Sequence, residues 1–358
     1  MSALTLKEVI ENIEPKDPDW ESRACAHVES LAIPPWSLGQ VLTLGVQLAG
    51  IQRTIHPCVD KKMILTMAAD HGIAEEGVSA FPQEVTMQMV ANIVAGGAGV
   101  NVLGKASGAE VRLVDMGVKE DMSELVKKGA VIDAKIAHGS ENFHKGPAMS
   151  RDQAVAALEA GINVASKVIQ EEGVELLGTG DLGIGNTTPS AAILAVMGEY
   201  PLTSITGRGT GLNNAGLMHK IKIIRESIAL NNPDKNDALD VLSKVGGYDI
   251  AGIAGMILSA AYHKVPVVVD GFISTAGALI AKGLCPTCAD YMIASHQSEE
   301  PGHQMMWQTL GMHPLLNLNF RLGEGTGAAV AMHLVECAAR CMNDMLTFED
   351  AGVTNGLA

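Results

Sequence analysis

Short apolar segments that each run into an acid, a glycine or a histidine recur along this chain of 358 residues, separated by longer stretches with helical periodicity. Five of them lie at residues 63–67, 111–114, 174–177, 265–269 and 291–294. Apolar strands that alternate with helices indicate βαβ units. The sequence therefore predicts an α/β fold, with a Rossmann-like, mostly parallel sheet flanked by helices. The carboxyl ends of such strands share one edge, where open α/β sheets bind their ligands.

The two ends of the chain differ in character from its middle. Residues 1–58 carry helical rather than strand patterns, including an amphipathic run from Trp36 to Ile55. The segment from Ala328 to Met345 is also amphipathic and helical. Because amphipathic helices need a partner for their apolar faces, we expect residues 1–58 plus 328–358 to form a small helical domain beside an α/β domain of residues 59–327.

Composition and charge exclude some classes of partner. The net charge of −15 at pH 7 disfavours nucleic acid and anionic membrane surfaces as ligands. Residues 1–19 are polar and acidic, without the basic and apolar regions of a signal peptide. The most apolar stretch, residues 251–269, is interrupted by His263, Lys264 and Pro266, which predicts a buried helix and a buried strand. We therefore expect a cytoplasmic protein that binds neither nucleic acid nor membrane.

Six cysteines occur, and free thiols in a reducing compartment are the expected state. Cys285 and Cys288 have the C-x-x-C spacing of metal or redox sites, while Cys337 and Cys341 lie one helical turn apart. Two pairs this far apart do not match a zinc ribbon, so no metal site is expected. The spacing alone assigns no role to Cys285 and Cys288.

A carboxylate stands between two glycines near the C-terminus. Gly323, Glu324 and Gly325 follow a strand-like run at residues 315–320 and precede the helical pattern that begins at Ala328. An acid there lies between a strand and a helix, and the glycines let a substrate approach the backbone. The ordinary alternative is a glycine-rich turn whose acid complements the helix dipole. The motif alone favours neither interpretation.

Two glycine-rich loops have the composition of anion sites. Residues 183–190, Gly-Ile-Gly-Asn-Thr-Thr-Pro-Ser, follow a strand and open a helix at residues 191–198, where N–H groups are available for an anion. Residues 206–211 form a second loop, and Lys220 on the next helix offers a cation. We favour a phosphate cradle over two ordinary turns and a solvated lysine. The loops match neither the dinucleotide fingerprint GxGxxG nor a P-loop.

Histidines follow strands in this chain without the spacing of a metal site. Asp70-His71-Gly72 lacks a second histidine at ligand spacing, and no GxSxG nucleophile elbow occurs. His296 and His303 lie seven residues apart around an acidic loop that contains glycine. A structured loop at the sheet edge explains this pair better than a bound metal does.

Six motifs occur together in a fixed order. They are residues 70–72 (Asp-His-Gly), 79–86 (Ser-Ala-Phe-Pro-Gln-Glu-Val-Thr), 183–188, 207–211 (Gly-Arg-Gly-Thr-Gly), 300–303 (Glu-Pro-Gly-His) and 323–328 (Gly-Glu-Gly-Thr-Gly-Ala). With them the chain resembles, over nearly its whole length, the nicotinate-nucleotide:dimethylbenzimidazole phosphoribosyltransferase family of cobalamin and cobamide biosynthesis. Enzymes of this family move phosphoribose from nicotinate mononucleotide to a lower-ligand base and release nicotinate. The β-glycosidic bond thereby becomes an α-glycosidic bond.

The resemblance implies a role for each matching residue. Glu324 becomes the general base that takes the N–H or O–H proton of the acceptor as it attacks C1′. The residues implied to hold the nucleotide phosphate and ribose are Asp181, Gly183, Gly185, Asn186, Thr187, Gly207, Arg208, Gly209, Gly211, Lys220 and Gly325. The residues implied to line the acceptor pocket are Ser79, Phe81 and Gln88. Neither a cofactor nor a metal is implied, and the protein partner is a second copy in a homodimer or a paralogue in a heterodimer.

Three departures from the family pattern concern the acceptor rather than the catalytic acid. Asp181 stands where Glu is usual, and Phe81 replaces a usual Tyr. Residues 33–39 depart from the usual Lys-Pro-x-Gly-Ser-Leu-Gly stretch. A pocket changed in this way is compatible with a phenolic base or a purine as well as with 5,6-dimethylbenzimidazole.

Two other functions compete with this one. A non-catalytic or weakly active paralogue would support a partner subunit, but loss of the base would mark that role, and Glu324 is present. A nucleotide-dependent dehydrogenase of Rossmann-like fold would need GxGxxG after a strand and an acid about 20 residues further on. Gly178, Gly180 and Gly183 have the GxGxxG spacing, but the loop that opens the helix at residues 191–198, residues 183–190, does not.

Overall fold

Six parallel strands form the main sheet of the protein, whose residues 3–354 are described by a computed structural model. The strands are β1 (Lys62–Ala69), β2 (Ala109–Gly117), β3 (Val131–Asp133), β4 (Leu176–Leu182), β5 (Val267–Val269) and β6 (Met292–Ala294). They pair in the order β3-β2-β1-β4-β5-β6, and every pairing is parallel. This is a Rossmann strand order, which confirms the predicted fold class. The order reverses between β1 and β4, the place where such sheets hold ligands.

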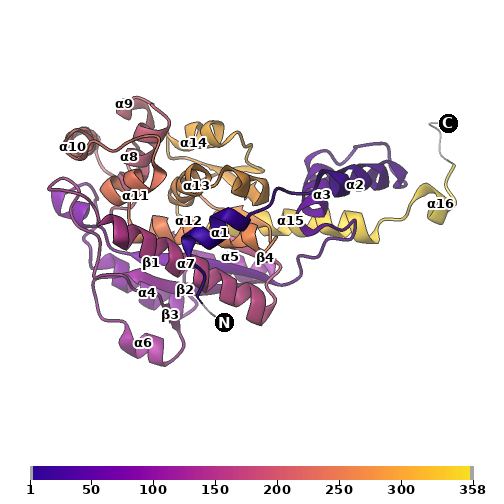
Figure 1. Cartoon of the computed structure of the whole chain (residues 1–358), viewed down its shortest axis with the longest axis horizontal. Coiled ribbons are helices and arrows are strands. Elements are labelled where there is room, and N and C mark those ends of the chain that lie inside the picture. Colours follow the sequence, from indigo (N-terminus) through magenta and orange to yellow (C-terminus); the bar gives the residue numbers. More distant parts are fainter. Residues whose placement is uncertain (1–2, 355–358) are drawn as a thin grey trace.

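Helices lie on both sides of this sheet (Figure 1). In chain order they are α1 (Leu6–Asn12), α2 (Pro18–Ser30), α3 (Gln40–Gln52), α4 (Val85–Val94), α5 (Gly99–Ser107), α6 (Ser123–Lys127), α7 (Arg151–Glu172), α8 (Thr187–Met197), α9 (Leu202–Ile205), α10 (Asn214–Asn231), α11 (Ala238–Val245), α12 (Tyr248–Tyr262), α13 (Phe272–Leu284), α14 (His303–Leu310), α15 (Thr326–Asp344) and α16 (Phe348–Ala351). Two further strands, β7 (His296–Ser298) and β8 (Leu316–Phe320), pair in parallel with each other. The strand expected at residues 315–320 therefore exists, but it belongs to this small sheet.

Both faces of the main sheet are covered because alternate residues of a strand point to opposite sides. Met63, Leu65 and Met67 of β1 lie in a core shared with α7, α12 and α13. Ile64 and Ala68, which alternate with them, lie in a second core shared with α5 and α15. All eight residues of β1 are buried, which explains why the strand forms a nearly continuous apolar run in the sequence.

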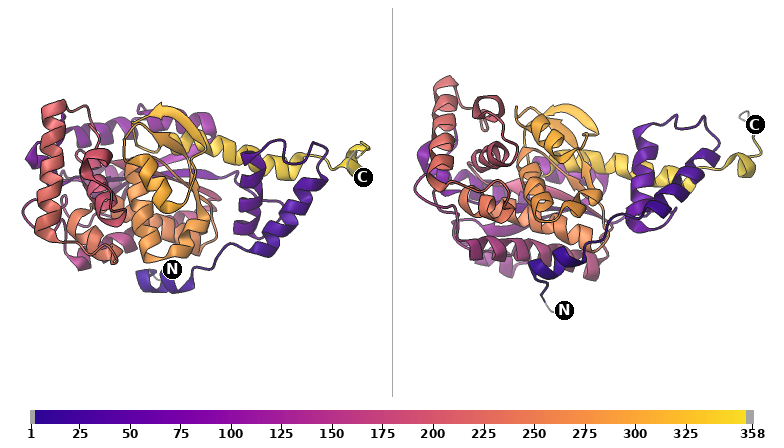
Figure 2. Two further views of the ribbon diagram at one scale, coloured as in Figure 1. Left: turned by 90° about the horizontal axis from the view of Figure 1, so that it is seen from above. Right: turned by 45° about the horizontal axis from the view of Figure 1, so that its top comes forward.

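Part of the molecule projects from this body as an extension formed by α2, α3 and the C-terminal part of α15 (Figures 1 and 2). Leu42, Val46 and Met342 lie in its separate apolar core. The first helix, α1, is not part of the extension: it packs on α7 and α12, and side chains of α7 accept the N–H groups of Leu4 and Leu6. Residues 1–58 thus do not form one helical unit as the sequence predicts, because the apolar face of α1 finds its partner on the main body.

The strand β4 extends further than the sequence predicts. The apolar run predicts a strand over residues 174–177 followed by a loop, but Gly178 and Gly180 lie inside β4. Glycine in a strand often marks a close approach of another segment. A Cβ at Gly178 would lie 2.7 Å from Met332 Cε of α15, and one at Gly180 would overlap the carbonyl oxygen of Glu324. These glycines therefore let α15 and the turn before it pack directly on the sheet.

Helix starts follow local signals in the sequence. Ser150 and Gln153 exchange side-chain and backbone hydrogen bonds, so the predicted capping box of α7 is confirmed. Helix α8 begins at Thr187, four residues before the predicted start. Pro189 is tolerated there because it lies in the first turn, where an N–H group has no partner within the helix.

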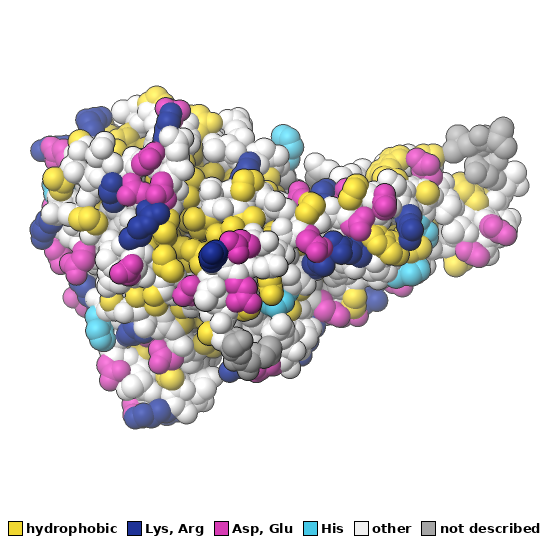
Figure 3. Space-filling view, viewed as in Figure 1, with side chains coloured by type: hydrophobic (Ala, Val, Ile, Leu, Met, Phe, Trp, Pro, Cys, Tyr) yellow, Lys and Arg dark blue, Asp and Glu magenta, His cyan; other side chains and the backbone are white. Residues whose placement is uncertain are grey.

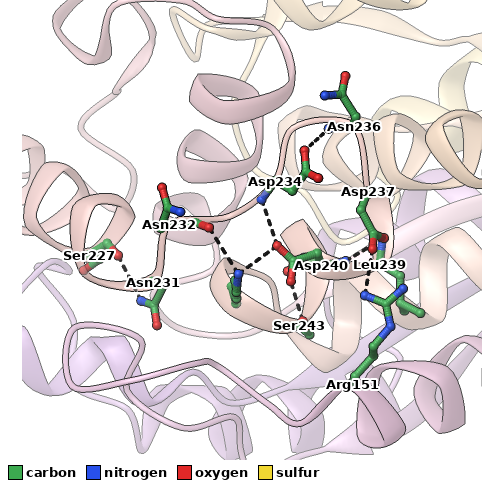
Figure 4. A network of polar contacts seen from close by, with 11 residues as sticks. Arg151, Ser227, Asn231, Asn232, Asp234, Asn236, Asp237, Leu239, Asp240 and Ser243 are labelled. Atoms are coloured by element: carbon green, nitrogen blue, oxygen red, sulfur yellow. Dashed lines mark hydrogen bonds and ion pairs between the residues drawn. The ribbon is translucent and has the colours of Figure 1, made fainter.

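A polar network joins the end of α10 to the start of α11 (Figure 4). Asp237 caps α11 and forms an ion pair with Arg151 of α7. The Asp240 carboxylate accepts the backbone N–H of Asp234 at 2.8 Å. Because α10 carries Lys220, this network helps to fix the helix that bears the predicted phosphate cation.

The apolar stretches form helices and strands of the main body. Tyr248–Tyr262 and Val267–Val269 are the buried helix and strand that the sequence predicts. Val85–Ser107 is long and apolar enough to cross a membrane, with 28% of it buried. In this structure it is broken at residues 95–98 into α4 and α5, and one such stretch is weak evidence for a membrane span. On the face shown in Figure 3, Lys and Arg side chains are scattered among Asp and Glu side chains.

We expect Gly180→Ala to destabilise the protein, because the added methyl group would overlap the Glu324 carbonyl oxygen. Overpacking of this kind lowers the free energy of unfolding by about 1–3 kcal/mol, which urea unfolding measures. Gly146→Ala is the control, since nothing lies within 4 Å of its added Cβ. Equal stability of the two variants would contradict the prediction.

Candidate active site

A cavity of about 400 Å³ opens at the carboxyl edge of the main sheet, between the end of β4 and the small β7–β8 sheet. Its size is in the range of small-molecule sites. The predicted site residues that line it are Phe81, Asp181, Gly183, Asn186, Thr187, Gly209 and Glu324. A wider hollow of about 810 Å³ between α8 and the α10–α11 connection contains none of the predicted residues. The first cavity is therefore the candidate site.

The backbone turns into the left-handed region at Glu324, where φ is 64°, and the flanking Gly323 and Gly325 have φ of 85° and 103°. Such a conformation costs a non-glycine residue roughly 1–2 kcal/mol. It places the Glu324 side chain, 4% exposed, in the cavity wall. Its Oε2 accepts the N–H of Val100 at the start of α5 at 3.3 Å, and Thr66 Oγ1 donates to its carbonyl oxygen at 2.8 Å.

The pKa of the Glu324 carboxyl is higher than that of an ordinary glutamate. Burial raises its pKa above the ordinary 4.5, the Val100 N–H lowers it, and the nearby Asp270 carboxylate raises it again. A carboxylate with a raised pKa is a better proton acceptor near neutral pH. The position and environment of Glu324 therefore suit a general base.

Asp181 lies against the same turn, at the end of β4. A Cβ at Gly323 would lie 3.0 Å from Asp181 Oδ2, which also accepts a hydrogen bond from Asn186 Nδ2 at 3.0 Å. Burial raises the pKa of Asp181 well above 3.8, and repulsion from the Asp270, Asp249 and Glu324 carboxylates raises it further. Its Oδ1 is buried and has no partner within residues 3–354. Asp181 therefore favours its neutral form and keeps one oxygen available to a ligand.

The N-terminus of α8 has no capping side chain and faces the cavity through Asn186 and Thr187. Lys220 lies behind it, fully buried, and donates from Nζ to Thr187 Oγ1 at 2.6 Å. Burial lowers the pKa of Lys220 to about 8, although the Glu300 carboxylate opposes this shift. The lysine is thus not a solvated surface cation, and its charge is poorly compensated. An anion at the start of α8 would meet both N–H groups and this charge.

The second glycine loop, residues 207–211, contributes Gly209 and Thr210 to the cavity wall. The Gly209 N–H donates to Glu300 Oε1 at 3.1 Å, and the Thr210 hydroxyl accepts the N–H of Ala80 at 2.9 Å. Burial raises the pKa of Glu300, while Lys220 lowers it. Residues 207–211 therefore tie the segment around residue 80 to the Glu300 loop.

Known proteins resemble this chain over nearly its whole length. A family model described as phosphoribosyltransferase matches residues 13–353. The nicotinate-nucleotide–dimethylbenzimidazole phosphoribosyltransferase of Desulfotalea psychrophila is 53% identical over 350 residues, 98% of this chain and 98% of the relative. The chain belongs to the nicotinate-nucleotide–dimethylbenzimidazole phosphoribosyltransferase family.

Further members of this phosphoribosyltransferase family agree in sequence and in fold. The relative of the same name from Syntrophotalea carbinolica is 49% identical over 351 residues, 98% of this chain and 99% of the relative. A crystal structure of the enzyme of this name from Thermus thermophilus superimposes with a TM-score of 0.89 at 38% identity, over 95% of this chain and 100% of that one. The family resemblance predicted from the six motifs is confirmed, and the protein is a phosphoribosyltransferase, a pentosyltransferase with the α/β fold of its family.

Some residues that the resemblance assigns to the phosphoribosyltransferase site lie outside the cavity wall. The Arg208 guanidinium donates to the Leu212 carbonyl and to Asn214 Oδ1, so it closes its own loop. The others outside the wall are Ser79, Gln88, Gly185, Gly207, Gly211, Lys220 and Gly325. Ser79 Oγ lies 3.0 Å from Thr210 Oγ1, and Gln88 is exposed on α4. Of the three predicted acceptor residues, only Phe81 lines the cavity.

Several residues of the wall lie in none of the motifs that the sequence singles out. They are Met89, Leu182, Gly271, Phe272, Ile273, Ser298, Arg321 and Leu322. Apolar members from α4 and α13 carry no motif because their spacing is that of ordinary core residues. Arg321 could have been predicted from the sequence, because it lies two residues before the turn that bears Glu324 and must therefore lie near the same site.

Three histidines that follow strands in the sequence, His71, His296 and His303, are buried. His71 is fully buried with Nε2 at 3.1 Å from Asp249 Oδ2; burial lowers its pKa, but the carboxylates produce a net rise. Burial lowers the pKa of His296 to about 4, and burial together with His296 lowers the pKa of His303 well below its ordinary 6.5. His296 is the first residue of β7, and His303 is the first residue of α14. Both therefore lie in regular structure beside the sheet edge, where the sequence predicts a structured loop. Within residues 3–354, no three His, Cys, Asp or Glu side chains form a group that would hold a metal ion, and the cysteines are free.

We expect Lys220→Met to raise the free energy of unfolding at pH 7, because wild type then keeps a buried charge. The folded-state pKa of about 8 lies below the ordinary 10.5. Between these values the unfolded chain binds more protons, so wild-type stability rises with pH. The advantage of the variant should therefore shrink from pH 7 towards pH 10.

Urea unfolding across this pH range measures the effect. Lys222→Met is the control, because Lys222 lies on the same helix with its side chain 65% exposed. A Lys220→Met protein that is less stable than wild type at pH 7 would disprove the inferred charge penalty.

Proposed function

We propose that this enzyme transfers phosphoribose from nicotinate mononucleotide to an aromatic lower-ligand base, giving an α-ribotide and nicotinate for cobalamin or cobamide synthesis. The observation that carries the proposal is the buried Glu324 carboxylate, presented by a left-handed turn to a cavity that also contains the uncapped start of α8. The wall of this cavity therefore contains both a proton acceptor and an anion site. The names of the relatives support the same pair of substrates.

In the proposed reaction the acceptor nitrogen, or a phenolic oxygen, attacks C1′ on the face opposite nicotinate. The C1′–N bond to nicotinate breaks, and its electron pair neutralises the pyridinium nitrogen, so the leaving group needs no proton. The acceptor proton passes to the Glu324 carboxylate, whose raised pKa suits it to this task. The same carboxylate stabilises positive charge that develops at C1′.

The phosphate of the donor is proposed to lie at the start of α8. There the helix dipole and N–H groups favour an anion, and Lys220 gains a partner for its charge. Arg321 lines the same cavity and lowers the pKa of Glu300, so it adds positive charge on this side. The backbone of the glycine loops leaves room for the ribose between this site and Glu324.

The Glu324→Gln variant keeps the shape of the side chain but cannot accept the proton. We expect kcat to fall by about 10²-fold or more, with KM for nicotinate mononucleotide nearly unchanged. In wild type, the rate should fall as acid protonates Glu324, with a midpoint above pH 4.5 because burial raises this pKa; the variant should lack that step. Glu349→Gln, in the distant α16, is the control.

Steady-state kinetics over pH 4–8 measure both quantities. A Glu324→Gln enzyme with kcat within about threefold of wild type would rule out general-base catalysis by this residue.

The acceptor is proposed to lie beside Phe81, whose ring is 53% exposed at the cavity mouth. Met89 and Phe272 add apolar surface, which suits a flat aromatic base. Phe81 lacks the hydroxyl of the usual Tyr, so it offers no hydrogen bond to a second ring heteroatom. Asp181 is one methylene shorter than the usual Glu and leaves more room. The names of the relatives make a benzimidazole the first candidate acceptor. The two departures at Phe81 and Asp181 make a phenol such as p-cresol the second.

We expect wild type to use both acceptors when equimolar 5,6-dimethylbenzimidazole and phenol compete, with the benzimidazole product in excess. Phe81→Tyr combined with Asp181→Glu should reduce the phenolic share of product, because both changes restore the usual pocket. Chromatography of the two α-ribotides measures this share. Exclusive use of the benzimidazole by wild type and variant alike would show that neither departure affects acceptor choice.

Dimerisation with a second copy or a paralogue, and a cytoplasmic location, stay predictions. A role as a non-catalytic paralogue subunit is disfavoured, since Glu324 and both glycine loops are present and converge on one cavity. A dehydrogenase role is disfavoured too, because the segment after β1 is Asp70-His71-Gly72. The GxGxxG spacing at residues 178–183 lies within β4 and directly after it, so these glycines do not form the turn that opens a helix.

A further inference from the structure

One fully buried carboxylate lies beside the candidate active site without lining it. Asp270 follows β5 directly and is 0% exposed. Its Oδ2 accepts the N–H of Gly325 at 3.0 Å. Its Oδ1 accepts the N–H groups of Gly327 at 2.7 Å and Ala328 at 2.9 Å. All three donors belong to the first turn of α15 or its N-cap, so Asp270 binds the segment that directly follows Glu324.

The Asp270 backbone is fixed by the strands on both sides of β5. Its N–H donates to Thr179 Oγ1 of β4 at 2.9 Å, and its carbonyl oxygen accepts from Ser295 Oγ, next to β6, at 2.8 Å. Burial raises the pKa of Asp270 to about 7 even though backbone N–H groups stabilise its charge. A carboxyl group kept in such an unfavourable place at the edge of a site is a candidate for a functional role.

The three hydrogen bonds determine how the chain enters α15. The N-cap residue Gly325 supplies no side-chain cap, so the Asp270 oxygens bind the N–H groups that a capping side chain would otherwise bind. With these groups held, the chain reaches the helix through left-handed conformations at Glu324 and Gly325. A left-handed glutamate is unfavourable alone and persists only where the surroundings hold it.

We propose that Asp270 is a positioning residue for phosphoribosyl transfer: its carboxylate, bound to the N–H groups of the first turn of α15, holds Glu324 in the left-handed conformation that turns its side chain into the cavity. The inference rests on the proposed role of Glu324 as general base. Asp270 lies in none of the six sequence motifs and reaches the substrate only through Glu324. Its effect is therefore on kcat rather than on nucleotide binding.

Asp270→Asn tests the proposal because it keeps the shape but replaces one acceptor oxygen with an NH₂ donor, which faces backbone N–H groups. We expect kcat to fall by about 10²-fold, the loss that a misplacement of about 1 Å produces. KM for nicotinate mononucleotide should stay within about twofold.

Asp115→Asn is the matched control. Asp115 is also buried near the end of a strand, accepts the N–H of Val118 and pairs with Lys135, but it lies in β2 outside the cavity. This variant should lose stability and keep kcat within about twofold of wild type. Thermal unfolding of both variants separates loss of stability from loss of rate.

A double-mutant cycle distinguishes positioning from a general structural role. Glu324→Gln leaves no base to position, so adding Asp270→Asn to it should slow the enzyme by less than about threefold. Equal losses in the wild-type and Glu324→Gln backgrounds would overturn the proposal, and so would a wild-type kcat in Asp270→Asn. Should the asparagine variant fail to fold, Asp270→Ser replaces it in the same cycle, since its hydroxyl still accepts an N–H group.

The cycle also separates this inference from the proposed function. If Glu324→Gln alone keeps its rate, the general-base assignment fails, whatever Asp270→Asn does. If Glu324→Gln is slow but Asp270→Asn is not, the general-base assignment stands and only the positioning role is disproved.

Discussion

The turn at residues 323–325 packs against the two central strands with no space between them, and the arrangement of the site depends on this contact. Gly180 of β4 has no Cβ to oppose the Glu324 carbonyl oxygen, and Thr66 of β1 donates a hydrogen bond to that same oxygen. The turn is thereby fixed at the point where the strand order reverses. Because Glu324 is held through its backbone, its side chain reaches the cavity without depending on contacts of its own carboxylate.

The buried titratable groups of the site are mostly acidic. Burial raises the pKa of Asp181, Asp270 and Glu324, and the Asp270 carboxylate raises the pKa of the other two further. Burial lowers the pKa of Lys220, which lies behind the start of α8. The proposed donor carries an anionic phosphate, which would compensate the buried charge of Lys220 at the start of α8.

The sequence predicts the sheet because buried strands form apolar runs, which are strong local signals. The turn at Gly323, Glu324 and Gly325 is ambiguous alone, and only the ordered set of six motifs implies a role for Glu324. The sequence does not predict the length of β4, since Gly178 and Gly180 look like loop residues until α15 is seen to pack on them. It also misses the apolar cavity wall and the place of α1, which depend on contacts between segments far apart in the chain. Ser79 and Gln88, assigned by resemblance, lie outside the wall, and their proposed roles stay untested.

Helix α15 belongs to two parts of the molecule at once. Its first turn, directly after Glu324, is bound by Asp270. Its last turns form the core of the projecting extension, where a Cβ at Gly45 would lie 2.7 Å from Met342 Cγ. Its 19 residues make a rod about 28 Å long. One continuous helix therefore joins the apolar core of the extension to the residue that directly follows Glu324.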